Sequence, residues 1–203
     1  MMRYIKRLGR SRGRSGEKGS ALVEMAFVLP LLVLLIFGSV EFGLMFKERL
    51  TIASAASSAG RTGATLGTRP EADFRILEAL EAGLYDQVDS GVLISVDIFR
   101  ADPVTGAKDM GAYNRYVFVG GMGCKWSPCP DPANFEDWGN PSLWGDPANR
   151  DTTLDAGGGG LDVLGVEVTY HHTPVTNILP ALDRDFTERA LVRLEPDVFG
   201  STP

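Results

Sequence analysis

Two pairs of residues are of the types that form disulfides or bind metal ions. Cys124 and Cys129 are the only cysteines, and they can close a small disulfide loop in an oxidising compartment. A zinc site would need two further ligands, for which His171 and His172 are the only histidines. Because neighbours on a strand point to opposite faces, only one histidine can easily reach such a site. We therefore predict a Cys124–Cys129 disulfide and no zinc.

Acidic residues are frequent between positions 131 and 162, and calcium favours oxygen ligands from a flexible loop. Their spacing does not match an EF-hand, and acids in loops rich in proline and glycine are usually solvated. We therefore expect these acids to be solvated and to bind no metal. The alternative hypothesis is a calcium site formed by some of Asp131, Glu136, Asp137, Asp146, Asp151, Asp155 and Asp162.

Motifs of enzymatic activity are missing from the sequence. The glycine run Gly157–Gly160 lacks the Lys-Ser/Thr of a phosphate-binding loop, so we interpret it as a linker. No G-x-S-x-G nucleophile elbow occurs, and the cysteine pair suits a structural role better than a nucleophilic one. The chain is expected not to be an enzyme and to need no cofactor.

Glu24 is the remaining candidate, because it stands at the very start of an apolar run. A carboxylate buried there without a partner is unfavourable. A cut after Gly19 would make Ser20 the new N-terminus, and its amine could neutralise Glu24 of a neighbouring subunit in an apolar filament core. Alternatively, Glu24 reaches the lipid headgroups at the cytoplasmic interface. The residues alone leave both roles open.

The apolar run after Glu24 is long enough to cross a bilayer. Met25–Val40 is free of charge, and Met25–Phe46 as a helix measures roughly 33 Å. Glu24 and Glu41 lie about 25 Å apart along such a helix, near opposite interfaces. A carboxylate costs far less there than at the centre, so we expect Glu41 to need no particular partner.

The charges around the run indicate its orientation. Seven Lys/Arg and one acid lie in residues 1–19, which places the N-terminus in the cytoplasm and the C-terminal domain outside. The remaining 13 basic and 25 acidic residues would repel phosphate, so no nucleic acid is expected as a partner. A cleaved export signal fits less well, because Lys47–Arg49 separate the run from the small residues at Ala53–Ala55.

A family resemblance rests on the same stretch. It is carried by the basic leader, Gly19, Glu24, Pro30 within the apolar run, Val40-Glu41-Phe42-Gly43, and the small-residue segment with Arg61, Gly63 and Ala64. About residues 15–66 resemble the N-terminal region of TadE-like pseudopilins, of the tight-adherence (Tad/Flp) branch of type IV pili. Met25 departs from the aromatic residue that this branch commonly has after the glutamate.

The resemblance implies a processing site, a location and partners. A prepilin peptidase would cleave between Gly19 and Ser20, and Glu24 would then act in assembly. The chain would be a single-pass protein of the bacterial inner membrane, involved in adhesion and in biogenesis of a Flp-type pilus. Its partners would be the lipid bilayer, the peptidase, other pilin and pseudopilin subunits and the inner-membrane assembly platform. The rival hypothesis is an uncleaved, membrane-tethered binding protein.

The predicted fold is α+β: a long N-terminal transmembrane, pilin-like helix, then a small extracytoplasmic domain with an antiparallel sheet. Residues 1–19 form a basic cytoplasmic leader, 20–68 the extended helix and 69–203 the domain. The small residues Ala53, Ala56, Gly60, Gly63 and Gly67 are predicted to pack against a neighbour or the chain's own domain, unless this part is a flexible stalk.

The domain is expected to start with a helix at Pro70, in whose first turn Asp73 suits the helix dipole. Alternating residues predict strands over 92–99, 113–119, 163–172 and 186–195, the first two forming a hairpin. Residues 120–160 form a long irregular loop. Its aromatic residues could form a partner's contact patch or a small core that pins the loop: Trp126, Phe135, Trp138 and Trp144. The helix has the apolar stripe Phe74, Leu77, Leu80 and Leu84.

Overall fold

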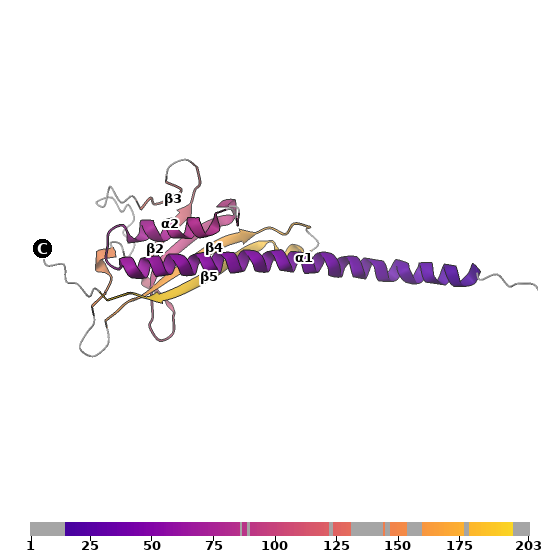
Figure 1. Cartoon of the computed structure of the whole chain (residues 1–203), viewed down its shortest axis with the longest axis horizontal. Coiled ribbons are helices and arrows are strands. Elements are labelled where there is room, and N and C mark those ends of the chain that lie inside the picture. Colours follow the sequence, from indigo (N-terminus) through magenta and orange to yellow (C-terminus); the bar gives the residue numbers. More distant parts are fainter. Residues whose placement is uncertain are drawn as a thin grey trace, which may run out of the picture.

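One long helix organises the whole chain (Figure 1). The structure, a computed structural model, describes residues 15–85, 87–88, 90–121, 124–130, 144, 147–153, 160–176 and 179–196. Helix α1 (Ser15–Leu66) has 52 residues, including Pro30, and spans about 78 Å. Its segment Gly19–Leu66 is long and apolar enough to cross a membrane, which fits a membrane-anchored single-pass protein. The predicted helix is confirmed, and it begins five residues earlier than expected.

An antiparallel sheet follows, as predicted, and it has five strands, one more than expected. Its spatial order is β3-β2-β1-β4-β5. The predicted hairpin is confirmed by pairs such as Val96 with Tyr116. No strand was predicted within the long loop. Trp126–Ser127 of that loop nevertheless pairs with the end of the hairpin and forms one edge of the sheet. The strands are β1 (Leu93–Ala101), β2 (Lys108–Phe118), β3 (Trp126–Ser127), β4 (Val163–His172) and β5 (Arg184–Arg193).

The C-terminal half of α1 and the shorter helix α2 (Ala72–Leu84) pack against the sheet (Figure 1). The buried stripe of α2 contains Ile76, whereas Phe74 is only half-buried, so the predicted stripe was wrong by one residue. Alternation along the strands supplies the opposing side chains. The core between the helices and the sheet includes Ile52, Ala56, Ile76, Leu80, Val96, Ile98, Val166 and Tyr170.

The small residues of α1 pack against the chain's own domain. Ala56 and Ala59 are fully buried, and Gly60 lies against Val192 and Ala190 of β5. A Cβ at Gly63 would come within 2.5 Å of both Ile76 and Leu164. Close approach of α1 to α2 and the sheet therefore requires glycine at this position, and the flexible-stalk alternative is wrong.

We expect Gly63→Ala to lower the free energy of unfolding by about 1–3 kcal/mol, because the new methyl group has no room between α2 and β4. Gly43 is the matched control, because a Cβ there would meet no atom within 4 Å. Gly43→Ala should be neutral or stabilising by about 0.5–1 kcal/mol, since alanine favours the helix. Denaturant unfolding of the full chain in detergent micelles compares the two variants. Equal effects would show that Gly63 is not a packing requirement.

Candidate functional site

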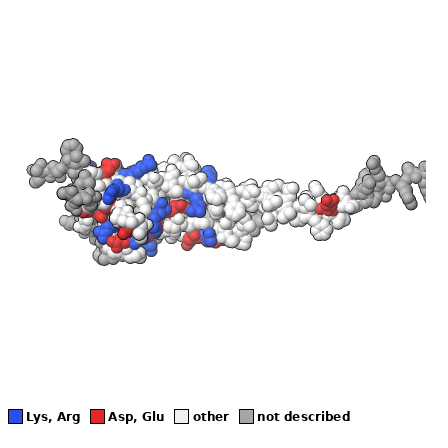
Figure 2. Space-filling view, turned by 90° about the horizontal axis from the view of Figure 1, so that it is seen from below, with Lys and Arg blue, Asp and Glu red and all other residues white. Residues whose placement is uncertain are grey.

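The N-terminal half of α1 has no cover from the part of its own domain that the structure describes. Every residue from Gly19 to Phe37 is exposed, and most of these side chains are large and apolar. Figure 2 shows charged groups crowding the domain, whereas the projecting helix is white apart from one red group near its N-terminal end. An apolar surface of this extent requires lipid or other proteins to cover it. We refer to residues 19–37 as the projecting segment.

Glu24 is the single charged residue of the projecting segment. Its side chain is exposed, and within the described part of the chain no hydrogen bond or ion pair to its carboxylate is found. Gly19 and Ser20 lie just before it, exposed and already within the helix, four and five residues after its first residue, Ser15. A Cβ at Gly19 would meet nothing within 4 Å. The structure thus leaves the predicted processing bond and Glu24 open to other molecules.

Glu41 behaves differently from the expectation for an interfacial carboxylate. Its side chain is fully buried, and Oε2 accepts a hydrogen bond from the backbone N–H of Val175 at 3.1 Å. Oε1 accepts a second one from the backbone N–H of Thr176. The loop between β4 and β5 is therefore fastened to α1 at this point. The expectation that Glu41 needs no partner was wrong, because a loop 134 residues further along the chain folds back onto it.

Removing this carboxylate should release the loop. In Glu41→Ala we expect amide hydrogen exchange at Val175 and Thr176 to accelerate about 10- to 100-fold, since a hydrogen bond to a charged group is worth roughly 1.5–3 kcal/mol. Glu41→Gln retains one acceptor oxygen and should give a smaller acceleration. Exchange measured on the full chain in micelles provides the test, with the amide of Val168 in central β4 as reference. Unchanged exchange at both loop amides would contradict the role of Glu41.

Polar contacts continue up the helix from Glu41 towards the domain. His172 is buried at the end of β4, and its Nδ1 lies 2.5 Å from Glu48 Oε2 of α1. Arg49 Nε donates to Glu188 Oε1 of β5 at 2.5 Å. Together these contacts orient the sheet on α1, so the projecting segment has a fixed direction relative to the domain.

His171 points to the opposite face of β4 and is exposed, as predicted for strand neighbours. Its Nδ1 and Nε2 lie 2.8 and 2.9 Å from Asp185 and Asp183. The hydrogen bond with Asp185, then that with Asp183, raises the pKa of His171 above its ordinary value. A raised pKa means that this contact stabilises the fold below the unfolded-state pKa and is lost as pH rises through the folded-state pKa. The effect on stability is small, because the groups are exposed to solvent.

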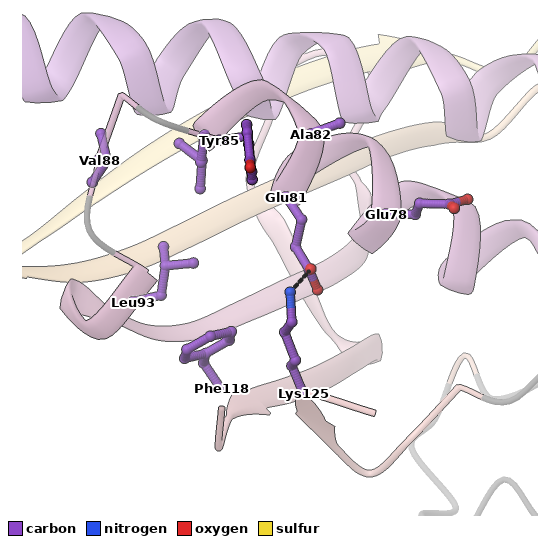
Figure 3. Close-up of a pocket in the computed structure, with 9 residues that line it drawn as sticks. Glu78, Glu81, Ala82, Tyr85, Val88, Leu93, Phe118 and Lys125 are labelled. Atoms are coloured by element: carbon purple, nitrogen blue, oxygen red, sulfur yellow. Dashed lines mark hydrogen bonds and ion pairs between the residues drawn. The ribbon is translucent and has the colours of Figure 1, made fainter. Parts of the chain in front are cut away.

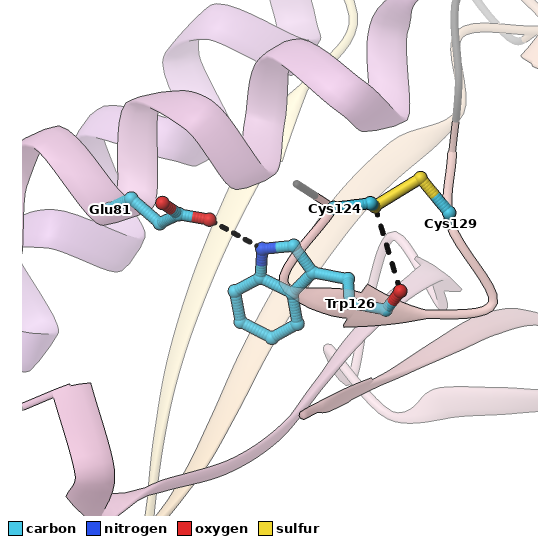
Figure 4. Close-up of a disulfide and its surroundings, with 4 residues drawn as sticks. All are labelled: Glu81, Cys124, Trp126 and Cys129. Carbon is cyan, nitrogen blue, oxygen red and sulfur yellow. Dashed lines mark hydrogen bonds between the residues drawn. A yellow bond between two sulfur atoms is a disulfide. The ribbon is translucent and has the colours of Figure 1, made fainter. Parts of the chain in front are cut away.

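The predicted disulfide between Cys124 and Cys129 is present (Figure 4). It closes the turn that carries β3, and Trp126 within this turn is buried. The indole Nε1 donates to Glu81 Oε1 of α2 at 2.7 Å. Trp144 is also buried in the core, which favours the small-core alternative for these two aromatic residues. Phe135 and Trp138 lie outside the described residues.

A hollow of about 630 Å³ lies between the C-terminal part of α2 and the edge of the sheet (Figure 3). Tyr85, Val88, Leu93 and Phe118 give it an apolar lining, and Glu81 and Lys125 point toward each other at 2.7 Å. Among the nine described residues that line it there is no Ser, Cys or His. Its geometry suits packing of an apolar group.

A buried network fastens the second half of the long loop. Asp73 of α2 is fully buried and pairs with Arg150, while Asn114 Nδ2 and Tyr116 Oη each donate to Asp73 Oδ2 at 2.7 Å. Burial, and then the charge of Asp73, raise the pKa of Tyr116. From the sequence, only an interaction of Asp73 with the helix dipole was predicted, and not its pairing with Arg150. The signal was its spacing of three and four residues from Ile76 and Leu77, which places it on the buried face.

Two of the calcium candidates are described, and both bind the chain itself. Asp162 accepts from the backbone N–H of Asp151 at 2.9 Å, and Asp151 accepts from the backbone and hydroxyl of Thr153. Among the residues described, no three His, Cys, Asp or Glu side chains gather to hold a metal ion. The remaining candidates lie outside the described residues: Asp131, Glu136, Asp137, Asp146 and Asp155.

Comparison with known proteins finds a similarity in the N-terminal helix. Residues 19–61 match the family model described as TadE-like protein. The match covers the projecting segment and most of the packed half of α1, so the resemblance expected from the sequence is confirmed over this part of the chain. No curated protein matches, and no solved structure matches.

Proposed function

We propose that this chain, TadE-like over residues 19–61, is a non-enzymatic pseudopilin that acts in the assembly of a tight-adherence (Flp-type) pilus. One observation carries the proposal. A single helix joins a packed half, fixed to the domain, to a projecting half whose apolar side chains and sole carboxylate have no cover from the described chain. Such a segment needs the bilayer before assembly and neighbouring helices during it.

In the proposed mechanism the basic leader first holds the subunit in the inner membrane, with its domain on the extracytoplasmic side. A prepilin peptidase then cleaves between Gly19 and Ser20 and removes all seven basic residues of the leader. The projecting segment is thereby freed to move from lipid into helix–helix contacts with other pilin or pseudopilin subunits, on the inner-membrane assembly platform. The low helix propensity of Gly16 and Gly19 makes local opening around the cleaved bond inexpensive.

Glu24 supplies the register of this contact. In the mature chain the new amine at Ser20 and the carboxylate of Glu24 carry opposite charges, four residues apart. Within an apolar contact each charge is strongly unfavourable unless it is paired, so the amine of one subunit pairs with Glu24 of its neighbour. A helix displaced by one turn would leave both charges unpaired, which selects one axial position.

The experiment that tests this function is deletion and complementation in a cell that makes the pilus. Loss of the chain should reduce surface pili and adhesion, and the wild-type chain should restore both. A matched chain that keeps the domain but has Leu32→Arg in the projecting segment should fail to restore them while its disulfide forms normally. Full piliation without the chain would refute the assembly role, and restoration by an uncleaved tether would favour a binding protein instead.

A further inference from the structure

We infer that the β4–β5 loop, at residues 173–176 and 179–183, is a second membrane contact that lies in the lipid interface beside α1. This inference goes beyond the proposed function, because it requires only that α1 crosses a bilayer. Figure 1 shows the loop lying along α1 on the side of the projecting segment. The occupant proposed for its exposed apolar surface is the lipid of the bilayer that holds α1.

The depth of the loop follows from where it is attached. A hydrocarbon core about 30 Å thick takes about 20 helical residues, which from Met25 ends near Leu44. Glu41 holds the loop backbone at Val175 and Thr176, and Leu179 Cδ1 lies 3.9 Å from the position of a Cβ at buried Gly38. Both attachment points therefore lie near the outer end of the core, where it meets the interface, and the loop lies there with them.

Charged residues resume at the same level along α1 and along the β4–β5 loop. Residues 173–182 contain no charged side chain, and charges resume at Asp183 and Arg184. On α1, beyond Glu41, which is buried against the loop itself, they resume at Lys47–Arg49. This is the level at which Glu48 contacts His172, and His172 pairs with Arg184 in the sheet. A common boundary between uncharged and charged residues is expected when helix and loop enter the same interface.

The surface of the loop suits lipid better than water. Val175 is 76% exposed, and Pro180 and Ala181 are exposed as well. Transfer of this apolar surface from water into lipid is favourable by roughly 25 cal/mol per Å² of surface removed from water.

The backbone of the loop is also adapted to a low-polarity medium, in which every N–H requires a partner. The N–H groups of Val175 and Thr176 donate to Glu41. Those of Leu182 and Asp183 donate to the carbonyls of Leu179 and Pro180 at 3.0 and 3.1 Å. Pro174 and Pro180 have no N–H to satisfy. These bonds lower the cost of moving the loop into the interface, and they give Glu41 partners where water is scarce.

Depth-dependent fluorescence quenching tests this contact on the full chain. Val175→Cys is labelled with the environment-sensitive dye NBD and reconstituted into vesicles of phosphatidylethanolamine and phosphatidylglycerol; the native cysteines are occupied in their disulfide. Val104→Cys is the matched control, because Val104 is 90% exposed in the β1–β2 turn at the far end of the sheet. Leu34→Cys in the projecting segment reports on the helix itself.

We expect the dye at position 175 to be quenched by nitroxide-bearing lipid and protected from aqueous iodide, and the dye at 104 to show the reverse. Iodide quenching at 175 equal to that at 104 would overturn the proposal. Protection from both quenchers would mean that a second copy of the chain covers the loop, and would overturn it too. Absence of lipid quenching at 34 would refute the membrane-spanning helix as well, whereas its absence at 175 alone refutes only the loop contact.

Discussion

Glu24→Ala is expected to abolish incorporation of the subunit into the pilus apparatus while leaving its membrane insertion unchanged. Insertion is preserved because alanine is tolerated in an apolar helix and the basic leader is intact. Assembly fails because the amine at Ser20 of a neighbouring subunit would be buried without its counter-charge, which costs about 3–5 kcal/mol. That corresponds to at least a hundredfold loss of affinity between subunits, at about 1.4 kcal/mol per factor of ten.

The measurement is the number of surface pili in cells whose own copy is replaced by the variant, together with the amount of chain in the membrane fraction. Glu24→Asp is the matched control, because it retains the charge and shortens the side chain by one methylene. It should support most of the wild-type piliation. Normal pilus numbers in Glu24→Ala, at equal membrane levels, would exclude the registering role of this carboxylate.

Asp73→Ala is expected to lower the free energy of unfolding of the domain by about 3–5 kcal/mol. The substitution leaves the guanidinium of Arg150 buried without a counter-charge and removes the acceptor of Asn114 and Tyr116. A domain of this size is stabilised by only about 5–15 kcal/mol, so a loss of this magnitude brings it close to unfolding. Denaturant unfolding of the full chain in micelles, followed by tryptophan fluorescence, measures the change.

Arg75→Ala provides the comparison on the same helix. Arg75 Nη1 lies 2.6 Å from Glu78 Oε2, but both side chains are about half exposed, with relative areas of 51% and 56%. Water screens such a pair, so its removal should cost less than about 1 kcal/mol. If Asp73→Ala and Arg75→Ala destabilise the domain equally, the buried network does not fasten the loop at 147–153 as described.

The elements with a strong periodic pattern could be predicted from the sequence. The uncharged run after Glu24 indicated α1, and alternation indicated β4 with its exact bounds and the β1–β2 hairpin. The two-residue strand β3 could not be predicted, because two residues show no period and it forms by pairing with the end of β2. The helix dipole explained Asp73 locally, and the membrane interface explained Glu41 locally. Neither explanation included the distant partner that each carboxylate has in the structure.

The missing information in both cases was long-range pairing. Arg150 lies 77 residues from Asp73, and Val175 lies 134 residues from Glu41. No local pattern of charge or hydrophobicity reports which distant segment folds onto a given carboxylate. A signal was nevertheless present for each: Asp73 stands on the apolar face of its helix, and the segment 173–182 carries no charge. An acid within an apolar face or an apolar run predicts a buried partner.

The N-terminus of the chain purified from membranes tests the central claim most directly. Intact-mass and N-terminal peptide mass spectrometry should show a mature chain that begins at Ser20, and a full-length chain in cells without the prepilin peptidase. Gly19→Leu in the wild-type cell should also leave the leader attached, since the residue before the cut is altered while α1 still forms. A chain that keeps its leader at Met1 or Met2 in cells with active peptidase would contradict the pseudopilin account and favour a permanent membrane tether.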